Sequence, residues 1–345
     1  MKGCNVLIIG SGLAGSSAAY HLTRCGVRDV TVIERMSGEH YERYHRTCGE
    51  AISERMLSMA DVPRGCIVRD VDTIRISCGD VDIDVPVEGH IIDRVRLLSD
   101  LRSGSDATFI KGTAESIRKD GQTYVVTCGG EEYRCRYLVG ADGVFSAVRR
   151  DLFGYGPKLR FAAVNNIVEG DADTTVLHFI VSDQYPGAYR WDFPGKDGCR
   201  SVGYVNGTDD VTEYLEQGKR FIAVGRDGPA VKDGCCLVGD AAVLTNPVCS
   251  GGIGVALISG RKAAECIAKG DLSPYQRWVD RDRSFNPHFM KAQETFREWD
   301  ADDYVDSVRP FRKGYSLFKG ALAIFRRPKW ANVYMSVWVA FRRGW

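Results

Sequence analysis

The chain has 345 residues, 44% of them hydrophobic, which is enough for a sizeable core in one large or two interleaved domains. Its 46 Lys and Arg residues balance 45 Asp and Glu residues, so the overall charge gives no indication of nucleic-acid binding. The 12 cysteines form no C-x-x-C pair, and the N-terminus begins with a strand pattern rather than a signal peptide. We therefore expect a cytoplasmic protein with reduced thiols and no metal site.

The first expected unit is a strand, a glycine-rich turn, a helix and a second strand. An apolar run over residues 5–9 reads as a buried parallel strand, and a helical pattern then extends to about residue 24. A second apolar run over residues 30–33 ends at Glu34. This order is typical of a dinucleotide-binding unit, in which Glu34 can accept hydrogen bonds from ribose hydroxyls.

The turn between strand and helix reads G-S-G-L-A-G over residues 10–15. Gly10 permits the tight turn, Gly12 lets the backbone approach a pyrophosphate, and Gly15 lets helix and strand pack closely. The helix N-terminus supplies free N–H groups for the phosphates. The unit alone does not distinguish FAD from NAD(P).

Two later turns favour FAD. Residues 137–143 read as a strand that ends in Asp142 and Gly143, and residues 235–242 repeat the pattern with Gly239 and Asp240. A glycine-rich helix start follows at residues 251–254, with a helix expected to about residue 268. Asp240 can bind the ribityl hydroxyls of FAD, and the N–H groups of this helix start can face the isoalloxazine ring.

These three blocks resemble the flavoprotein superfamily of aromatic hydroxylases and geranylgeranyl reductases. Residues 45–53, H-R-T-C-G-E-A-I-S, are similar to the reductase segment in which a cysteine faces the flavin, so the resemblance implies that Cys48 is catalytic. The motif Y-x-W-x-F-P at residues 189–194, followed by Gly203, resembles the one that lines the isoprenoid cavity of the reductases. The position of Val243 is a histidine in many aromatic hydroxylases.

The resemblance also extends the expected site. Arg94 is expected to begin a helix that reaches the FAD pyrophosphate. The expected cofactor contacts are Gly10, Gly12, Leu13, Ala14, Gly15, Glu34, Arg35, Arg46, Cys48, Gly49, Arg94, Ala114, Asp142, Gly143, Gly239, Asp240, Pro247, Gly251, Gly252 and Ile253, and the expected substrate contacts are Tyr189, Trp191 and Phe193. Without the resemblance, the residues favour Cys48 as a small buried packing residue, and the alternating aromatics could equally form a plain sheet core.

The predicted fold class is α/β, with a Rossmann-like FAD-binding domain interleaved with an antiparallel-sheet substrate domain and a helical C-terminal region. Alternating apolar residues in 70–87 and a strand-like pattern in 161–205 indicate the second sheet. The predicted FAD-binding domain comprises residues 1–69, 93–150 and 226–275. The predicted substrate domain comprises 70–92 and 151–225, and residues 276–345 form the helical region.

The C-terminal tail is basic and aromatic. Residues 309–345 contain nine Lys and Arg residues and no Asp or Glu. Trp330, Tyr334, Trp338 and Phe341 would share one face of a helix. Such a helix suits an anionic membrane surface, but packing on its own domain with a solvated basic face is the favoured interpretation.

The leading hypothesis is an FAD-dependent reductase of C=C bonds in isoprenoid chains of lipid precursors, peripheral at the membrane. Its electron donor would be ferredoxin, a deazaflavin or NADPH. One alternative is a flavin-dependent monooxygenase of an aromatic or polyketide substrate, which O2 uptake with NAD(P)H oxidation would reveal. The other is a non-catalytic lipid carrier, whose flavin no donor would reduce.

Overall fold

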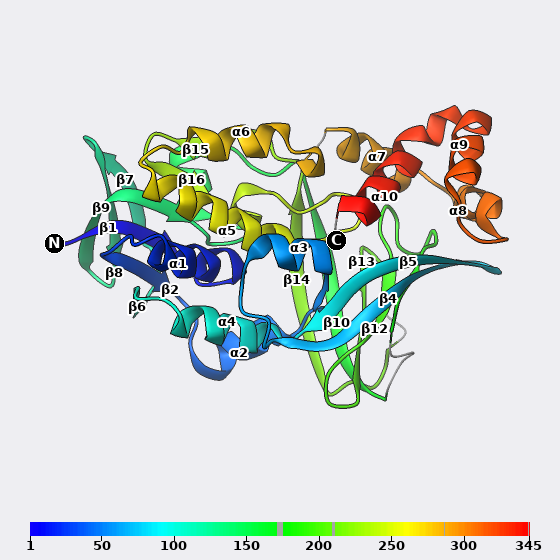
Figure 1. Cartoon of the computed structure of the whole chain (residues 1–345), viewed down its shortest axis with the longest axis horizontal. Coiled ribbons are helices and arrows are strands. Elements are labelled where there is room, and N and C mark those ends of the chain that lie inside the picture. Colours follow the sequence, from blue (N-terminus) through cyan, green and yellow to red (C-terminus); the bar gives the residue numbers. More distant parts are fainter. Residues whose placement is uncertain (171–174, 209–210, 286, 344) are drawn as a thin grey trace.

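The computed structural model describes residues 1–170, 175–208, 211–285, 287–343 and 345. Two β-sheets lie side by side along an elongated molecule, and the C-terminal helices cover one end (Figure 1). The predicted α/β class, with one Rossmann-like part, one antiparallel sheet and a helical C-terminal region, is confirmed. No helix in the described ranges is long and apolar enough to cross a membrane.

The first sheet has the order β15-β16-β9-β1-β2-β6; β8 also pairs with β9, and β7 pairs with β8. Its strands are β1 (Lys2–Ile9), β2 (Val30–Glu34), β6 (Thr108–Lys111), β7 (Ser116–Asp120), β8 (Thr123–Cys128), β9 (Glu131–Gly140), β15 (Val231–Lys232) and β16 (Cys235–Leu237). The central pairs, β1 with β2 and β9, are parallel. Val6, Leu7 and Ile8 are fully buried, as expected for a parallel strand covered on both faces.

Helices on this sheet bring distant segments together. They are α1 (Leu13–Arg24), α2 (Gly38–Arg46), α3 (Glu54–Ala60), α4 (Arg94–Ser103), α5 (Ile253–Ala268) and α6 (Ser273–Arg281). A Cβ on Gly260 of α5 would lie 2.3 Å from the carbonyl oxygen of Ala14 on α1. The Ser17 hydroxyl also donates to the carbonyl of Leu257 over 2.7 Å. These contacts pack the first turns of α1 directly against the middle of α5.

The second sheet has the order β14-β10-β13-β12-β11-β4-β5-β3. Its strands are β3 (Ala51–Ser53), β4 (Ile67–Cys78), β5 (Val81–Ile92), β10 (Leu159–Glu169), β11 (Val176–Ile180), β12 (Arg190–Pro194), β13 (Cys199–Val205) and β14 (Glu216–Val224). Neighbouring strands are antiparallel except β4 and β11. The chain therefore enters this sheet twice, before α4 and again after β9, while the proposed domain boundaries stay a prediction.

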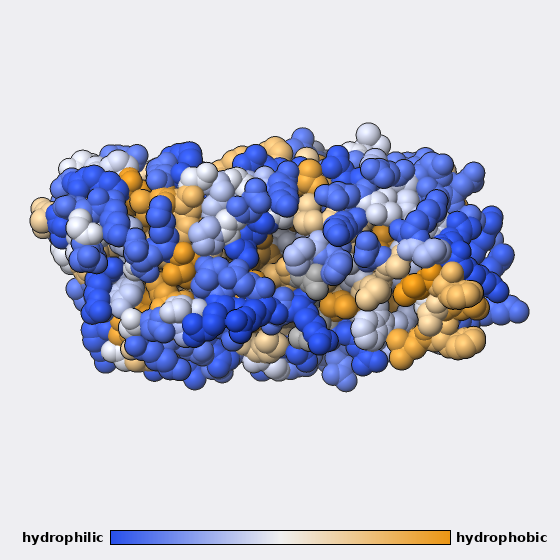
Figure 2. All heavy atoms as spheres, turned by 90° about the horizontal axis from the view of Figure 1, so that it is seen from above, coloured by the Kyte–Doolittle hydropathy of each residue, from blue (hydrophilic) through white to orange (hydrophobic). Residues whose placement is uncertain are grey.

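The C-terminal region consists of short helices. They are α7 (His288–Arg297), α8 (Ala301–Val308), α9 (Leu317–Arg326) and α10 (Ala331–Arg343). The tail's aromatic residues do not share one surface. Trp330 is 1% exposed, lies in a 3-10 turn before α10 and packs on Trp299, with ring centroids 4.9 Å apart. Figure 2 shows hydrophobic residues gathered at the end of the molecule that α8 and α9 occupy in Figure 1.

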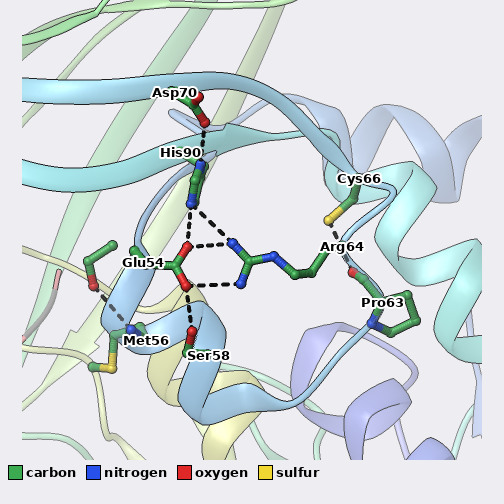
Figure 3. Close-up of polar contacts among 9 residues, drawn as sticks. Glu54, Met56, Ser58, Pro63, Arg64, Cys66, Asp70 and His90 are labelled. Carbon is green, nitrogen blue, oxygen red and sulfur yellow. Dashed lines mark hydrogen bonds and ion pairs between the residues drawn. The ribbon is translucent and has the colours of Figure 1, made fainter.

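A polar cluster fixes α3 against β4 and β5 (Figure 3). Glu54 accepts hydrogen bonds from Arg64, Ser58 and the Nε2 side of His90, at 2.6 Å for the histidine. His90 Nδ1 faces Asp70 at 2.9 Å. The Arg64, Ser58 and His90 bonds hold the pKa of the Glu54 carboxyl well below its usual range. The cluster thereby anchors β3, the strand that follows the Cys48 segment.

Candidate active site

A single cavity of about 580 Å³ extends from the end of β1 to the face of the second sheet. The structure brings most of the predicted site to it. Every predicted cofactor or substrate residue lines this cavity except Gly15, Arg46, Gly239 and Pro247. These residues come from segments more than 200 positions apart, and their individual roles stay predictions.

The three glycines of the first turn have distinct surroundings. Gly10 has a φ of +96°, and a Cβ there would lie 2.5 Å from the Ala141 carbonyl oxygen. A Cβ on Gly15 would lie 2.0 Å from the carbonyl oxygen of Gly10. A Cβ on Gly12, by contrast, would meet only His45 Cε1, at 3.7 Å. Gly10 and Gly15 thus serve the fold, whereas Gly12 keeps backbone open toward the cavity, where a pyrophosphate would approach.

Glu34 is held at one end of the cavity. Its Oε2 accepts from the backbone N–H and the hydroxyl of Ser11, at 2.7 and 3.0 Å, and its Oε1 accepts from the N–H of Met36 at 2.8 Å. Arg35 and Ala114 line the same cavity. A fixed carboxylate at the end of β2 suits the ribose of the adenosine half of FAD.

The Asp142 and Asp240 turns are joined by Arg149, which was not among the predicted site residues. Arg149 is 3% exposed, and its guanidinium donates to the carbonyls of Val144 and Ala241, at 2.6 and 2.8 Å. Asp142 Oδ2 accepts from the N–H groups of Ala147 and Val148. Arg149 therefore holds the two turns in a fixed relation, although nearly 100 residues separate them.

Both aspartates line the cavity, and burial raises the pKa of each carboxyl group. Thr245 donates to Asp240 Oδ1 over 2.8 Å. Asp142 Oδ1 and Arg94 Nε are buried and have no hydrogen-bond partner among the described residues. A hydroxyl of FAD would satisfy the Asp142 acceptor, and a phosphate oxygen of FAD would satisfy the Arg94 donor. The residues present therefore fit FAD.

Arg94 begins α4, as expected, and contacts two residues of the Cys48 segment. Its backbone N–H donates to Glu50 Oε1 over 3.0 Å, and its Nη2 lies 3.4 Å from His45 Nδ1. Burial, reinforced by Arg94 and Arg220, lowers the pKa of His45 to about 2, so the imidazole is neutral. Burial also raises the pKa of Glu50 to about 7.

The Cys48 segment rests directly on the aromatic strand β12. A Cβ on Gly49 would lie 3.0 Å from a ring carbon of Phe193 and 3.7 Å from Trp191 Nε1. The Ser201 hydroxyl donates to the carbonyl of Cys48 over 3.1 Å. A side chain at residue 49 would require the Phe193 ring to shift, so the two motifs that were read separately in the sequence are in direct contact.

The aromatic wall is both buried and part of the cavity lining. Trp191 and Phe193 are 8% and 6% exposed, and Tyr189 donates from its hydroxyl to the carbonyl of Cys249 over 2.6 Å. Trp191 Nε1 donates to Asn165 Oδ1 over 3.2 Å. A Cβ on Gly203 would lie 2.3 Å from the Trp191 ring, which explains why this glycine accompanies the motif.

Several residues that line the cavity were not predicted from the sequence. Phe179 on β11 packs edge-on against Tyr189 and Phe193, with centroids 4.9 and 5.0 Å apart. Phe341 and Trp345 close the cavity from the C-terminal region. The alternation of β11 could have indicated Phe179, but no local signal places residues 341 and 345 beside the Cys48 segment.

Arg46 departs most from its expected role. Its guanidinium pairs with Glu216 on β14 through two bonds, at 2.7 and 2.8 Å, and it does not line the cavity. Arg220, four positions after Glu216 on β14, lines the cavity instead, and its guanidinium stacks over the ring of Tyr44 at 3.8 Å. A contact between Arg46 and FAD stays a prediction.

Comparisons with known proteins agree with this geometry. The family model of FAD-dependent oxidoreductases matches residues 5–51. The chain is 26% identical to digeranylgeranylglycerophospholipid reductase 2 of Methanopyrus kandleri, over 85% of this chain and 87% of the relative. It is 27% identical to digeranylgeranylglycerophospholipid reductase of Thermoplasma volcanium, over 89% and 91%. A geranylgeranyl bacteriochlorophyll reductase-like structure from Thermoplasma acidophilum superposes with a TM-score of 0.79 at 21% identity, covering 98% of this chain and 99% of that one.

These findings confirm the resemblance to geranylgeranyl reductases that the motifs indicated. They also confirm the predicted class of enzyme and its cofactor, an FAD-dependent oxidoreductase.

Proposed function

We propose that the protein reduces C=C bonds in the isoprenoid chains of a lipid precursor. The observation that carries this proposal is the contact between Gly49 and the aromatic wall. It places Cys48 at the junction of the FAD-type turns and an apolar chamber, within one cavity. The relatives named digeranylgeranylglycerophospholipid reductases cover most of the chain and support the same substrate class.

In this proposal, one set of residues binds FAD and another binds the isoprenoid chain. Gly12 and the N-terminus of α1 would hold the pyrophosphate of FAD, while Asp240 and the start of α5 would hold its ribityl chain and ring. Bound and reduced FAD supplies a hydride for the double bond. Tyr189, Trp191 and Phe193 would bind the apolar chain and exclude water.

Reduction of a double bond also needs a proton, and the Cys48 segment offers one. In the proposed arrangement, Cys48 Sγ holds a proton beside the double bond or sets its position sterically. The backbone N–H of Arg94, bonded to Glu50, and the Ser201 hydroxyl, bonded to the Cys48 carbonyl, fix the segment that carries the thiol. The neutral His45 places no charge beside it.

The alternative, a monooxygenase, has less support. Aromatic hydroxylase-type structures share the fold, as the probable FAD-dependent monooxygenase of Pseudomonas aeruginosa does at 16% identity and a TM-score of 0.68, covering 88% of this chain and 99% of that one. Such a likeness shows the fold alone. The electron donor stays part of the proposal, as ferredoxin, a deazaflavin or NADPH, and so does an anionic membrane surface as partner.

The test is an anaerobic single turnover. Protein with chemically reduced flavin is mixed with a digeranylgeranylglycerol lipid, and the flavin absorbance and the lipid mass are followed together. We expect flavin reoxidation with the gain of two hydrogens per double bond. Reoxidation only after O2 is admitted, with oxygen incorporated into an added aromatic substrate, would favour the monooxygenase. A flavin that no donor reduces would favour a lipid carrier.

A further inference from the structure

Helix α9 exposes an apolar face that its own fold leaves uncovered. Phe318 and Phe325 are 78% and 84% exposed, and Leu317 is 56% exposed. They lie at spacings of seven and eight residues, so they project from one side of the helix. Ala323, on another side, is 2% exposed and packs into the molecule. The helix is thus apolar toward the core and toward solvent, which is unusual for a surface helix.

Positive charge surrounds this face. Lys313 precedes the helix, Arg326 ends it and Lys329 follows it, and all three side chains are exposed. Three other tail arginines are already paired with Asp80 or Asp306, and they contribute less. An apolar face bordered by unburied cations matches the boundary between anionic headgroups and acyl chains.

The neighbouring helix connects this face to the cavity. Met335 and Trp338 of α10 are 56% and 39% exposed. On the same helix, Val337, Ala340 and Phe341 line the cavity that holds the aromatic wall. One face of α10 therefore lines the proposed substrate chamber, while another exposes the apolar side chains of Met335 and Trp338.

We propose that the outer face of α9, formed by Leu317, Phe318 and Phe325, inserts into an anionic lipid bilayer, and that the isoprenoid chain passes along α10 from the bilayer into the cavity. This inference rests on the proposed function for the passage of substrate, but not for the docking itself. It differs from the idea of a whole amphipathic tail, because Trp330 is buried and Tyr334 donates from its hydroxyl to the carbonyl of Ser307.

Docking is tested with the FAD-loaded, full-length protein and vesicles of phosphatidylglycerol and phosphatidylcholine. The variants Phe318→Glu and Phe325→Glu should each weaken sedimentation with these vesicles at least tenfold. The matched control is Leu215→Glu, since Leu215 is 61% exposed and lies just before β14 in the other sheet. This control should bind like the original protein, and unchanged FAD absorbance and urea midpoints would show that the variants fold.

Charge and stoichiometry complete the binding test. Arg326→Gln should reduce vesicle binding, and the original protein should release vesicles as salt shortens the Debye length from about 10 Å to about 3 Å. Analytical ultracentrifugation could instead show that Phe318→Glu dissociates a dimer while vesicle binding stays intact. In that case a second copy of the chain covers the outer face of α9, and the proposal is overturned. Equal binding by Phe318→Glu, Phe325→Glu and Leu215→Glu would overturn it as well.

The route is tested separately from the chemistry. Phe318→Glu should slow flavin reoxidation by a geranylgeranyl lipid in vesicles at least tenfold, and it should leave reoxidation by a short, soluble prenyl diphosphate unchanged. Equal slowing with both substrates would overturn the route. If the original protein reduces neither substrate, the proposed reductase function fails, while the sedimentation result still decides whether α9 docks.

Discussion

Replacing Gly12 by alanine should abolish FAD binding and leave the folded chain almost as stable as before. The new Cβ would touch only His45 Cε1, at an ordinary 3.7 Å, and the φ of −66° is one that alanine adopts readily. Alanine is a poorer N-cap than glycine by about 0.5 kcal/mol, but it restricts the unfolded chain by about 0.4–1 kcal/mol. The free energy of unfolding of the FAD-free protein should therefore change by less than about 0.5 kcal/mol.

Gly15→Ala is the matched comparison, because its Cβ would lie 2.0 Å from the Gly10 carbonyl oxygen. That backbone atom cannot move aside easily, so the variant should lose about 1–3 kcal/mol without any ligand. Urea unfolding of the FAD-free proteins measures both values. Added FAD at a hundred times its Kd should stabilise the original protein by about 2.7 kcal/mol, and Gly12→Ala by almost nothing.

Two results would refute this reasoning. One is a Gly12→Ala protein that purifies yellow with full FAD content, which would mean that no cofactor approaches the backbone there. The other is an FAD-free Gly12→Ala protein as unstable as Gly15→Ala, which would mean that the turn is a packing element throughout.

Cys48→Ala should keep FAD yet slow alkene reduction more than tenfold, a barrier increase above about 1.4 kcal/mol; unchanged turnover would make Cys48 a packing residue. Trp191→Phe keeps an aromatic ring but loses the indole N–H bond to the sheet, so lipid mass spectra should show a changed pattern of reduced double bonds, and a loss of stability alone would argue for a core role. Burial raises the pKa of Glu50 from 4.5 to about 7, so its ionisation should lower stability as pH rises through that range, by up to about 3 kcal/mol. The urea midpoint of Glu50→Gln should not show this decline as pH rises. Parallel pH curves for the variant and the original protein would contradict the assignment to Glu50. Glu54 has the opposite sign: its pKa is lowered in the folded chain, so its stabilisation is present above the unfolded value of about 4.5 and is lost as pH falls. Glu54→Gln should therefore lose less stability on acidification than the original protein does.

The parts of the fold that sequence reasoning recovered are those fixed by neighbours along the chain. Residues 10–15 determine their turn by their own φ angles and close contacts, and the alternation in β5 follows from a sheet with one buried face. The helix starting at Arg94 was expected, and so were the strand ends that carry Asp142 and Asp240.

The parts that sequence reasoning did not recover depend on contacts between distant segments. Trp330 has the spacing of a surface stripe, but Trp299 is placed beside it and buries it. The ion pair between Arg46 and Glu216 on β14 joins residues 170 positions apart, and no local pattern predicts it. Nothing in residues 149–153 predicts that Arg149 would reach the carbonyl of Ala241. These pairings arise only after both sheets have formed.

The position of β16 has a consequence for how the protein must be made. Strand β9 pairs on one side with β1. On its other side β8 pairs with residues 131–135, and β16, which begins at Cys235, pairs with residues 138–140. Until the ribosome has delivered β16, the end of β9 at residues 138–140 carries unpaired N–H and C=O groups and can recruit strands from other nascent chains. Fragments that stop before residue 235 should therefore aggregate rather than fold, and a shorter soluble version of the protein is better sought by trimming exposed loops than by cutting the chain in two.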